Sequence, residues 1–65
     1  MNKHHYAIRT NWYGEVTTIY RWATSKQQAR LAMVRYLAKV YGRSMIAIDQ
    51  YLRDGDRCKV WEVNE

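Results

Sequence analysis

Residues 25–41 constrain the fold most, because they carry both end signals and the body of one long helix. Ser25 is a favoured N-cap residue, and Gln28 stands three places later, where the partner in a capping box belongs. The Thr24–Gln27 pair has the same spacing, which leaves the first residue open by one. Strong helix formers follow, and Gly42 can adopt the left-handed conformation that ends a helix. We therefore predict a single long helix from Ser25 to Tyr41.

The segment before this helix has the pattern of an antiparallel hairpin. Residues 6–10 alternate between apolar and polar, and residues 16–22 are rich in β-branched and aromatic types. Asn11 and Gly14 bound the predicted turn, since both types tolerate a positive φ. The register stays open, because shifting a strand by one residue reverses its faces. A four-residue turn places Tyr6, Ile8, Thr17 and Ile19 on one face and Arg9, Tyr20 and Trp22 on the other, whereas a three-residue turn groups Tyr6, Ile8, Tyr20 and Trp22.

The segment after the helix predicts a second hairpin. Residues 45–52 read as a third strand and residues 58–63 as a fourth, with the turn signal Asp54-Gly55 between them. A two-residue turn would place Ile48 opposite Trp61. The fold class that follows is α+β, a single domain over residues 1–65 with the order ββαββ. We expect a four-stranded antiparallel sheet with the helix packed on one face, and a loose segment at residues 1–5.

The small size of the chain makes self-association attractive. Its 65 residues include one cysteine, Cys58, so no internal disulfide can stabilise a core of limited size. The helix carries two apolar stripes on nearly opposite sides, and a helix lying on one sheet needs only one of them. The spare stripe is a candidate homodimer contact. One stripe holds Ala29, Ala32, Met33, Tyr36 and Val40, and the other, proposed for the dimer, holds Leu31, Val34, Ala38 and Tyr41.

The chain lacks the residue patterns of an enzyme. There is no Gly-rich phosphate loop, no nucleophile motif and no Cys/His spacing typical of a metal site. Asp54 and Asp56 are explained as turn residues, and Cys58 as a small apolar filler in a strand. We therefore expect a non-enzyme without a cofactor or metal. No apolar run is long enough to span a membrane and no signal segment is recognisable, so we expect a cytoplasmic protein.

Positive charge and aromatic residues point to binding. The net charge is +5, and the aromatics are six Tyr and three Trp without Phe, types whose rings carry a polar handle. An acidic protein surface, a nucleoprotein complex or nucleic acid is the expected partner. On and around the first hairpin lie Arg9, Trp12, Tyr13, Tyr20, Arg21 and Trp22, where cations can neutralise phosphates and rings can stack on bases. This arrangement resembles the sheet-reading DNA-binding domains of the integrase-arm and AP2 type, although two predicted strands here follow the helix.

A second resemblance concerns the joint between the first hairpin and the helix. Residues 22–32 read as a strand end, a Ser start and then Gln-Ala-basic-x-Ala, and Ile46, Ile48 and Trp61 follow in a closing hairpin. Over residues 17–63 this order is similar to small phage anti-CRISPR proteins directed at type I surveillance complexes. The resemblance implies a stoichiometric inhibitor that occupies a surface of a host defence nucleoprotein complex, encoded by a phage or another mobile element. DNA binding through the basic, aromatic hairpin face is the alternative. For either function we predict the contact residues Arg9, Trp12, Tyr13, Tyr20, Arg21, Arg35 and Lys39.

Overall fold

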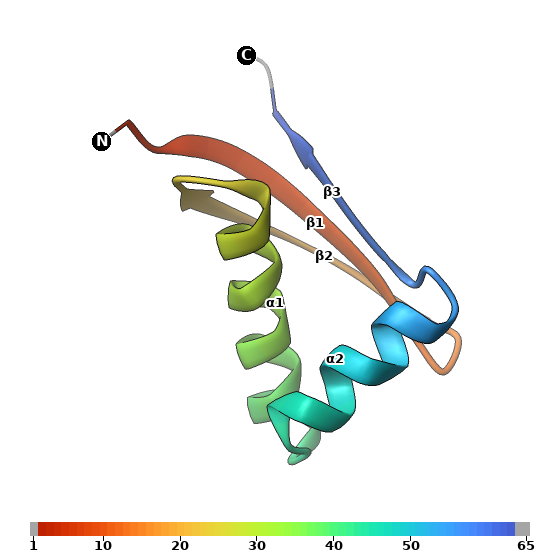
Figure 1. The fold of residues 1–65 in the computed structure, drawn as a ribbon. Coiled ribbons are helices and arrows are strands. Elements are labelled where there is room, and N and C mark those ends of the chain that lie inside the picture. Colours follow the sequence, from red (N-terminus) through yellow and green to blue (C-terminus); the bar gives the residue numbers. More distant parts are fainter. Residues whose placement is uncertain (1, 64–65) are drawn as a thin grey trace.

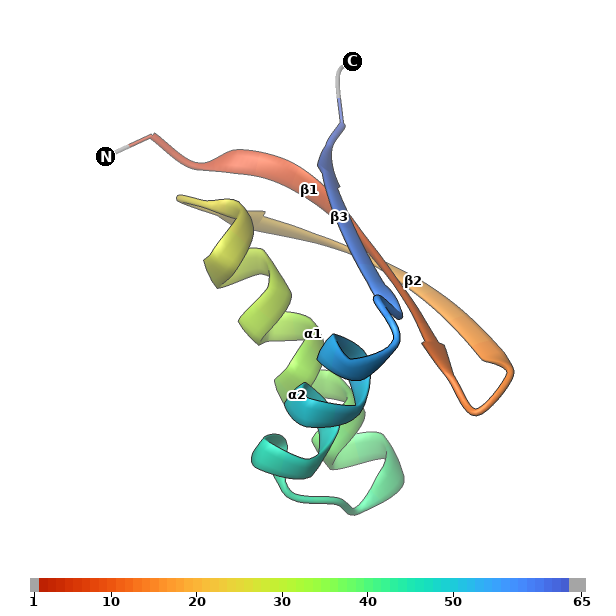
Figure 2. The same ribbon diagram turned by 45° about the vertical axis from the view of Figure 1, so that its right-hand side comes forward.

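Three strands and two helices make up the fold in the computed structural model, which describes residues 2–63. The strands form one antiparallel sheet in the order β2-β1-β3, and both helices lie on the same face of it (Figures 1 and 2). The α+β class is therefore confirmed, but the predicted four strands and one helix are wrong. The elements are β1 (His4–Trp12), β2 (Glu15–Ala23), α1 (Lys26–Tyr41), α2 (Met45–Asp54) and β3 (Cys58–Glu62).

The helix α1 has the ends that its sequence predicts. Ser25 is the N-cap, and its hydroxyl accepts a hydrogen bond from the backbone N–H of Gln28 at 3.2 Å. Gly42 is the C-cap at φ 64°, and its N–H donates to the carbonyl of Ala38. The Gln28 side chain departs from the expected capping box, since its oxygen accepts from the backbone N–H of Thr24 and not of Ser25.

Residues 45–54 form the helix α2, so the strand predicted for residues 45–52 is wrong. Ser44 is its N-cap and accepts from the N–H of Ala47 at 3.2 Å, which starts the helix. Ile48 and Leu52, four residues apart, are buried under one face, whereas Ile46 is 80% exposed. Burial therefore repeats every four residues, as on a helix, and not every two residues, as on a strand.

The Asp-Gly signal at Asp54-Gly55 ends a helix here and does not form a hairpin turn. Gly55 is the C-cap of α2, and the N–H of Arg57 donates to the carbonyl of Leu52 at 2.9 Å. The strand β3 then runs antiparallel to β1, and Ile8 lies opposite Val60. The predicted pairing of Ile48 with Trp61 is therefore wrong, because β3 finds its partner at the other end of the chain.

The first hairpin follows the face assignment of the four-residue turn. At the turn, β1 extends two residues beyond its predicted end, to Trp12, and β2 begins one residue earlier than predicted, at Glu15, which leaves Tyr13 and Gly14 as the loop. Both loop residues have positive φ, 50° and 88°, as a type I′ turn requires. Ile8 lies opposite Ile19 and Tyr6 opposite Arg21, with their side chains on the helix side. β1 begins at His4, so residues 4 and 5 of the predicted loose segment belong to a strand. Met1 lies outside the described residues.

The core lies between this side of the sheet and the two helices. It takes Ile8 and Ile19 from the sheet and Ile48 and Leu52 from α2. The contribution of α1 mixes the two predicted stripes, and the buried residues of α1 are Ala29, Met33, Val34 and Leu37.

The predicted dimer stripe is not a continuous exposed surface. Val34 is buried in the core, and Tyr41 stacks on Trp12 with ring centroids 5.4 Å apart. Ala38 is half-buried, and Leu31 alone of the stripe is largely exposed. The prediction of Val34 as a dimer contact is therefore wrong.

Candidate nucleic-acid interface

One face of the sheet carries no helix and is referred to below as the open face. In an antiparallel pair, residues directly opposite each other point to the same side, so the strand register defines this face. Figures 1 and 2 show both helices on the other side of the sheet. The open face consists of His5, Ala7, Arg9 and Asn11 from β1, Val16, Thr18, Tyr20 and Trp22 from β2, and Lys59 and Trp61 from β3.

Three large aromatic rings stand on the open face. Tyr20 is 55% exposed, Trp22 63% and Trp61 44%. Tyr20 of β2 and Trp61 of β3 flank Ala7 of the central strand β1. Ala7 is fully buried although no helix covers it. The neighbouring side chains therefore close over the sheet backbone and still present ring surface to solvent.

His5 extends this aromatic surface along β1. Its ring stacks on that of Trp22 at 4.6 Å with 10° between the planes, and lies 5.8 Å from Tyr20. Paired rings of this kind are held in place by their neighbours, so little ordering is required when a further flat group stacks on them.

Two cations of the open face lie directly opposite each other. Arg9 of β1 pairs with Lys59 of β3, and among the described residues neither takes part in an ion pair. Like charges placed opposite each other across two strands are destabilising. None of the described strand positions on the open face is acidic, so no carboxylate on the strands offsets the charge of Arg9 and Lys59.

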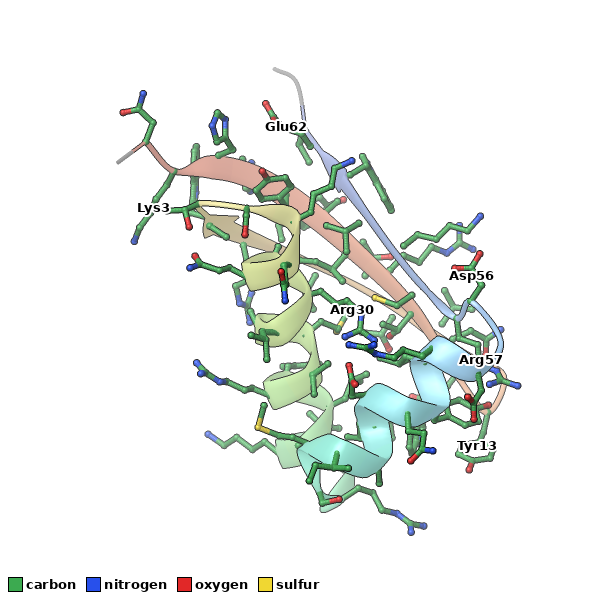
Figure 3. The ribbon with its side chains drawn as sticks, viewed as in Figure 1. Lys3, Tyr13, Arg30, Asp56, Arg57 and Glu62 are labelled. Atoms are coloured by element: carbon green, nitrogen blue, oxygen red, sulfur yellow. The ribbon has the colours of Figure 1, made fainter. Side chains whose placement is uncertain are left out.

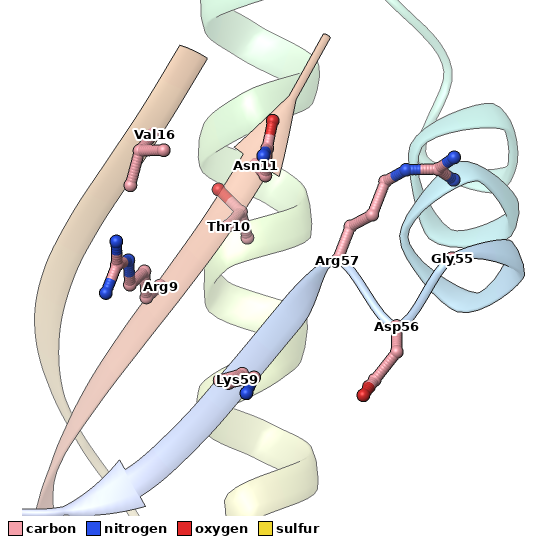
Figure 4. A pocket seen from close by; sticks show the side chains of 8 residues that line it. All are labelled: Arg9, Thr10, Asn11, Val16, Gly55, Asp56, Arg57 and Lys59. Atoms are coloured by element: carbon pink, nitrogen blue, oxygen red, sulfur yellow. The ribbon is translucent and has the colours of Figure 1, made fainter. Parts of the chain in front are cut away.

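A hollow of about 370 Å³ borders these cations where the open face meets the loop before β3. Figure 4 shows Arg9 and Lys59 on neighbouring strands with α1 behind the sheet, and the side chain of Arg57 runs back toward α2. Asp56, in the loop, contributes one carboxylate to the rim. The hollow is lined by Arg9, Thr10, Asn11, Val16, Gly55, Asp56, Arg57 and Lys59.

The predicted contact residues divide among four places, so the single cluster expected around the first hairpin is wrong. Arg9 and Tyr20 lie on the open face. Arg21 and Arg35 line a second hollow between β2 and α1, and Lys39 is in the last turn of α1. Trp12 and Tyr13 lie at the tip of the hairpin. The division follows from the strand register, because alternate residues of one strand belong to opposite faces.

The hairpin tip is an aromatic cluster that supports the fold. Trp12 lies 4.8 Å from the ring of Tyr51 and 5.4 Å from that of Tyr41. Tyr13 stacks on Tyr51 at 4.3 Å, and its N–H donates to the Tyr51 hydroxyl at 3.1 Å. Figure 3 shows Tyr13 and Arg57 near each other at this end of the sheet, and the Arg57 guanidinium lies 4.1 Å from the Tyr51 ring.

The Tyr41 phenol at this tip has a raised pKa. Desolvation raises the pKa of the Tyr41 phenol, and the nearby Glu15 carboxylate raises it further. The phenol is therefore a neutral hydrogen-bonding group at physiological pH. These contacts give Trp12 and Tyr41 structural partners, and they tie the hairpin to both helices.

Three residues of the open face, His5, Lys59 and Trp61, were not predicted from the sequence as contacts. Trp22 was assigned to the basic and aromatic group of the first hairpin but not to the predicted contact residues. The available signal was their spacing, because Tyr20 and Trp22, like Lys59 and Trp61, are two residues apart on one strand. The pairing of β3 with β1, which brings the two groups together, is not contained in either local pattern.

Metal ligation and thiol reactivity depend on the His, Cys, Asp and Glu side chains of the described residues. No group of three or more His, Cys, Asp or Glu side chains in residues 2–63 could hold a metal ion. Burial raises the pKa of the Cys58 thiol, which disfavours the reactive thiolate. Within the same residues, no helix is sufficiently long and apolar to cross a bilayer.

Comparisons with protein-family models, with curated proteins and with solved structures found no match to this chain. The geometry of the open face and its chemistry are therefore the basis of the proposals below.

Proposed function

We propose that the protein binds single-stranded nucleic acid on the open face of its sheet. The observation that supports this most is the combination of exposed rings with Arg9 and Lys59 on a face without acidic strand positions. Proteins that bind single strands combine cations that follow the phosphates with rings on which bases stack.

A single strand fits this face better than a duplex does. The exposed surfaces are ring faces, and these stack on bases only if the bases are not already stacked within a double helix. Each base–ring stack is worth about 1–3 kcal/mol. Two phosphate contacts predict a slope of log affinity against log salt near −1.4, from about −0.7 per contact on a single strand.

The inhibitor of a host nucleoprotein complex stays a prediction from the sequence. A basic, aromatic face also suits an acidic protein surface, but no observation on the described residues favours a protein partner over nucleic acid. Titrations with free oligonucleotides distinguish the two functions, because an inhibitor that acts on protein alone has no affinity for them.

Binding to labelled homopolymers tests the proposal. Fluorescence anisotropy is measured with oligothymidylate, oligouridylate and a duplex of equal length. At least one of the two single strands should bind more tightly than the duplex. Tyr20→Ala and Trp61→Ala should each weaken that binding roughly 5- to 150-fold, the equivalent of one lost stack. Tyr36→Ala is the matched control, since it removes a partly exposed ring that lies on α1 and not on the open face.

The charges are tested in the same assay. Arg9→Gln and Lys59→Gln should each make the salt slope shallower by about 0.7, whereas Arg43→Gln, outside the open face, should leave it unchanged. Circular dichroism melts establish that each variant is folded. An absence of binding at low salt, or variants of the open face that bind like the controls, would refute the proposal.

A further inference from the structure

A second basic hollow lies beside the open face, between the edge strand β2 and α1, and is called the β2–α1 groove below. Its volume is about 360 Å³, close to that of the hollow at Arg9 and Lys59. Its cations are Lys3, Arg21 and Arg35, and none of its lining residues is acidic. Trp22 and Leu31 supply apolar walls, so the groove has the same chemistry as the open face.

The cations of the groove form no ion pairs with carboxylates among the described residues. The Arg21 guanidinium donates to the carbonyl of its neighbour Tyr20 at 2.8 Å, which holds it against β2. Arg35 is exposed on α1, seven residues after Gln28 and hence on the same side of that helix. Figure 3 labels Lys3 just ahead of β1, beside the first turn of α1 and the end of β2.

Trp22 joins the two surfaces. Its ring stacks on His5 on the open face, and the same residue lines the β2–α1 groove. β2 is an edge strand, so no other strand lies between Trp22 and the groove. The open face and the groove therefore meet at Trp22, on the free edge of β2.

We infer that the β2–α1 groove continues the binding track and takes the sugar–phosphate backbone of the same single strand. The inference rests on the proposed function and adds the path of the ligand. Thr18, opposite Arg9, and Trp22 are four residues apart along β2, about 14 Å at the usual rise of a strand. That length holds at most about four nucleotides at the 3.4 Å spacing of a stacked strand, and fewer where the bases separate to stack on the rings, so four nucleotides suffice to span the open face and a longer strand reaches the groove.

The dependence of affinity on oligonucleotide length tests this path. The probes are a tetramer and a dodecamer of whichever homopolymer, thymidylate or uridylate, binds better. Arg35→Gln should weaken the dodecamer and make its salt slope shallower by about 0.7, and should leave the tetramer unchanged. Arg43→Gln removes the same charge in the α1–α2 connection and should change neither probe. Arg21→Gln is a second variant and should behave like Arg35→Gln.

The outcomes separate the path from the function. Equal losses for the tetramer and the dodecamer, or no loss for either with both groove variants, would overturn the path while the open face still binds. If the unaltered chain binds neither probe at low salt, the proposed function itself fails and the path falls with it.

Discussion

Ile46 and Ile48 show, at the scale of single residues, why residues 45–54 are a helix. They are two residues apart, so a strand would place them on one face, and a helix places them far apart around its axis. Ile48 is fully buried and Ile46 is 80% exposed. The alternation of residue types predicts a strand, and the burial of Ile48 and Leu52 against the sheet decides for a helix.

The substitutions Ile48→Asp and Ile46→Asp test this assignment directly. Ile48→Asp should unfold the protein, because an unpaired carboxylate in the core costs several kcal/mol, comparable with the total stability of so small a domain. Ile46→Asp should change the free energy of unfolding by about 0.5 kcal/mol or less. Urea titrations followed by circular dichroism measure both, and equal destabilisation by the two variants would contradict the helix.

At the scale of elements, the two helices are linked by charge as well as by packing. Arg30 of α1 donates to the carboxylate of Asp49 in α2, and the Arg53 side chain lies 3.0 Å from the same carboxylate. The hydrogen bond from Arg30 is the largest contribution that lowers the pKa of Asp49 below its usual value. The carboxylate is partly exposed, so the stabilisation is expected to be below about 1 kcal/mol.

This link predicts how Asp49→Asn depends on pH. The folded pKa of Asp49 is lowered, so its stabilisation is fully present above the unfolded pKa of about 3.9 and is lost as the pH falls below it. The variant should be less stable than the unaltered chain at pH 7, and the difference should shrink toward pH 2. Asp54→Asn, at the end of α2, is the control in urea titrations at both pH values. A difference that persists unchanged at low pH would contradict the role of the ion pair.

The elements also show which parts of the fold the sequence could predict. α1 was predictable because each of its ends is marked by a local signal, Ser25 at the start and Gly42 at the end. α2 was not, because Ile-Ala-Ile followed by Asp-Gly satisfies the local rules of a strand and a hairpin turn. Its N-cap Ser44 and the four-residue interval from Ile48 to Leu52 were signals of equal strength for a helix. A choice between two locally valid patterns is made by tertiary packing.

The candidate site was predictable in composition and not in arrangement. Its residue types, Arg with Tyr and Trp on the first hairpin, were evident from the sequence. Which of them share a face depends on the register, which places Arg9 and Tyr20 together and Trp12 on the other side. Lys59 and Trp61 join them through the pairing of β3 with β1, a contact between opposite ends of the chain.

At the scale of the whole molecule, the tryptophans divide between the two sides of the sheet. Both helices cover one side of the sheet (Figure 2). On that side, Trp12 packs against Tyr41 and Tyr51 at the hairpin tip. The other side presents Trp22 and Trp61 together with the cations Arg9 and Lys59. The central claim is that ligand binding uses the second set and leaves the first undisturbed.

The indole N–H signals of the three tryptophans test this claim most directly. Two-dimensional ¹H–¹⁵N spectra of the labelled protein, assigned with single Trp→Phe variants, are recorded while a single-stranded oligonucleotide is added. The account predicts that the signals of Trp22 and Trp61 shift with the titration and that the signal of Trp12 stays in place. A shift of Trp12 with Trp22 and Trp61 unmoved would contradict it.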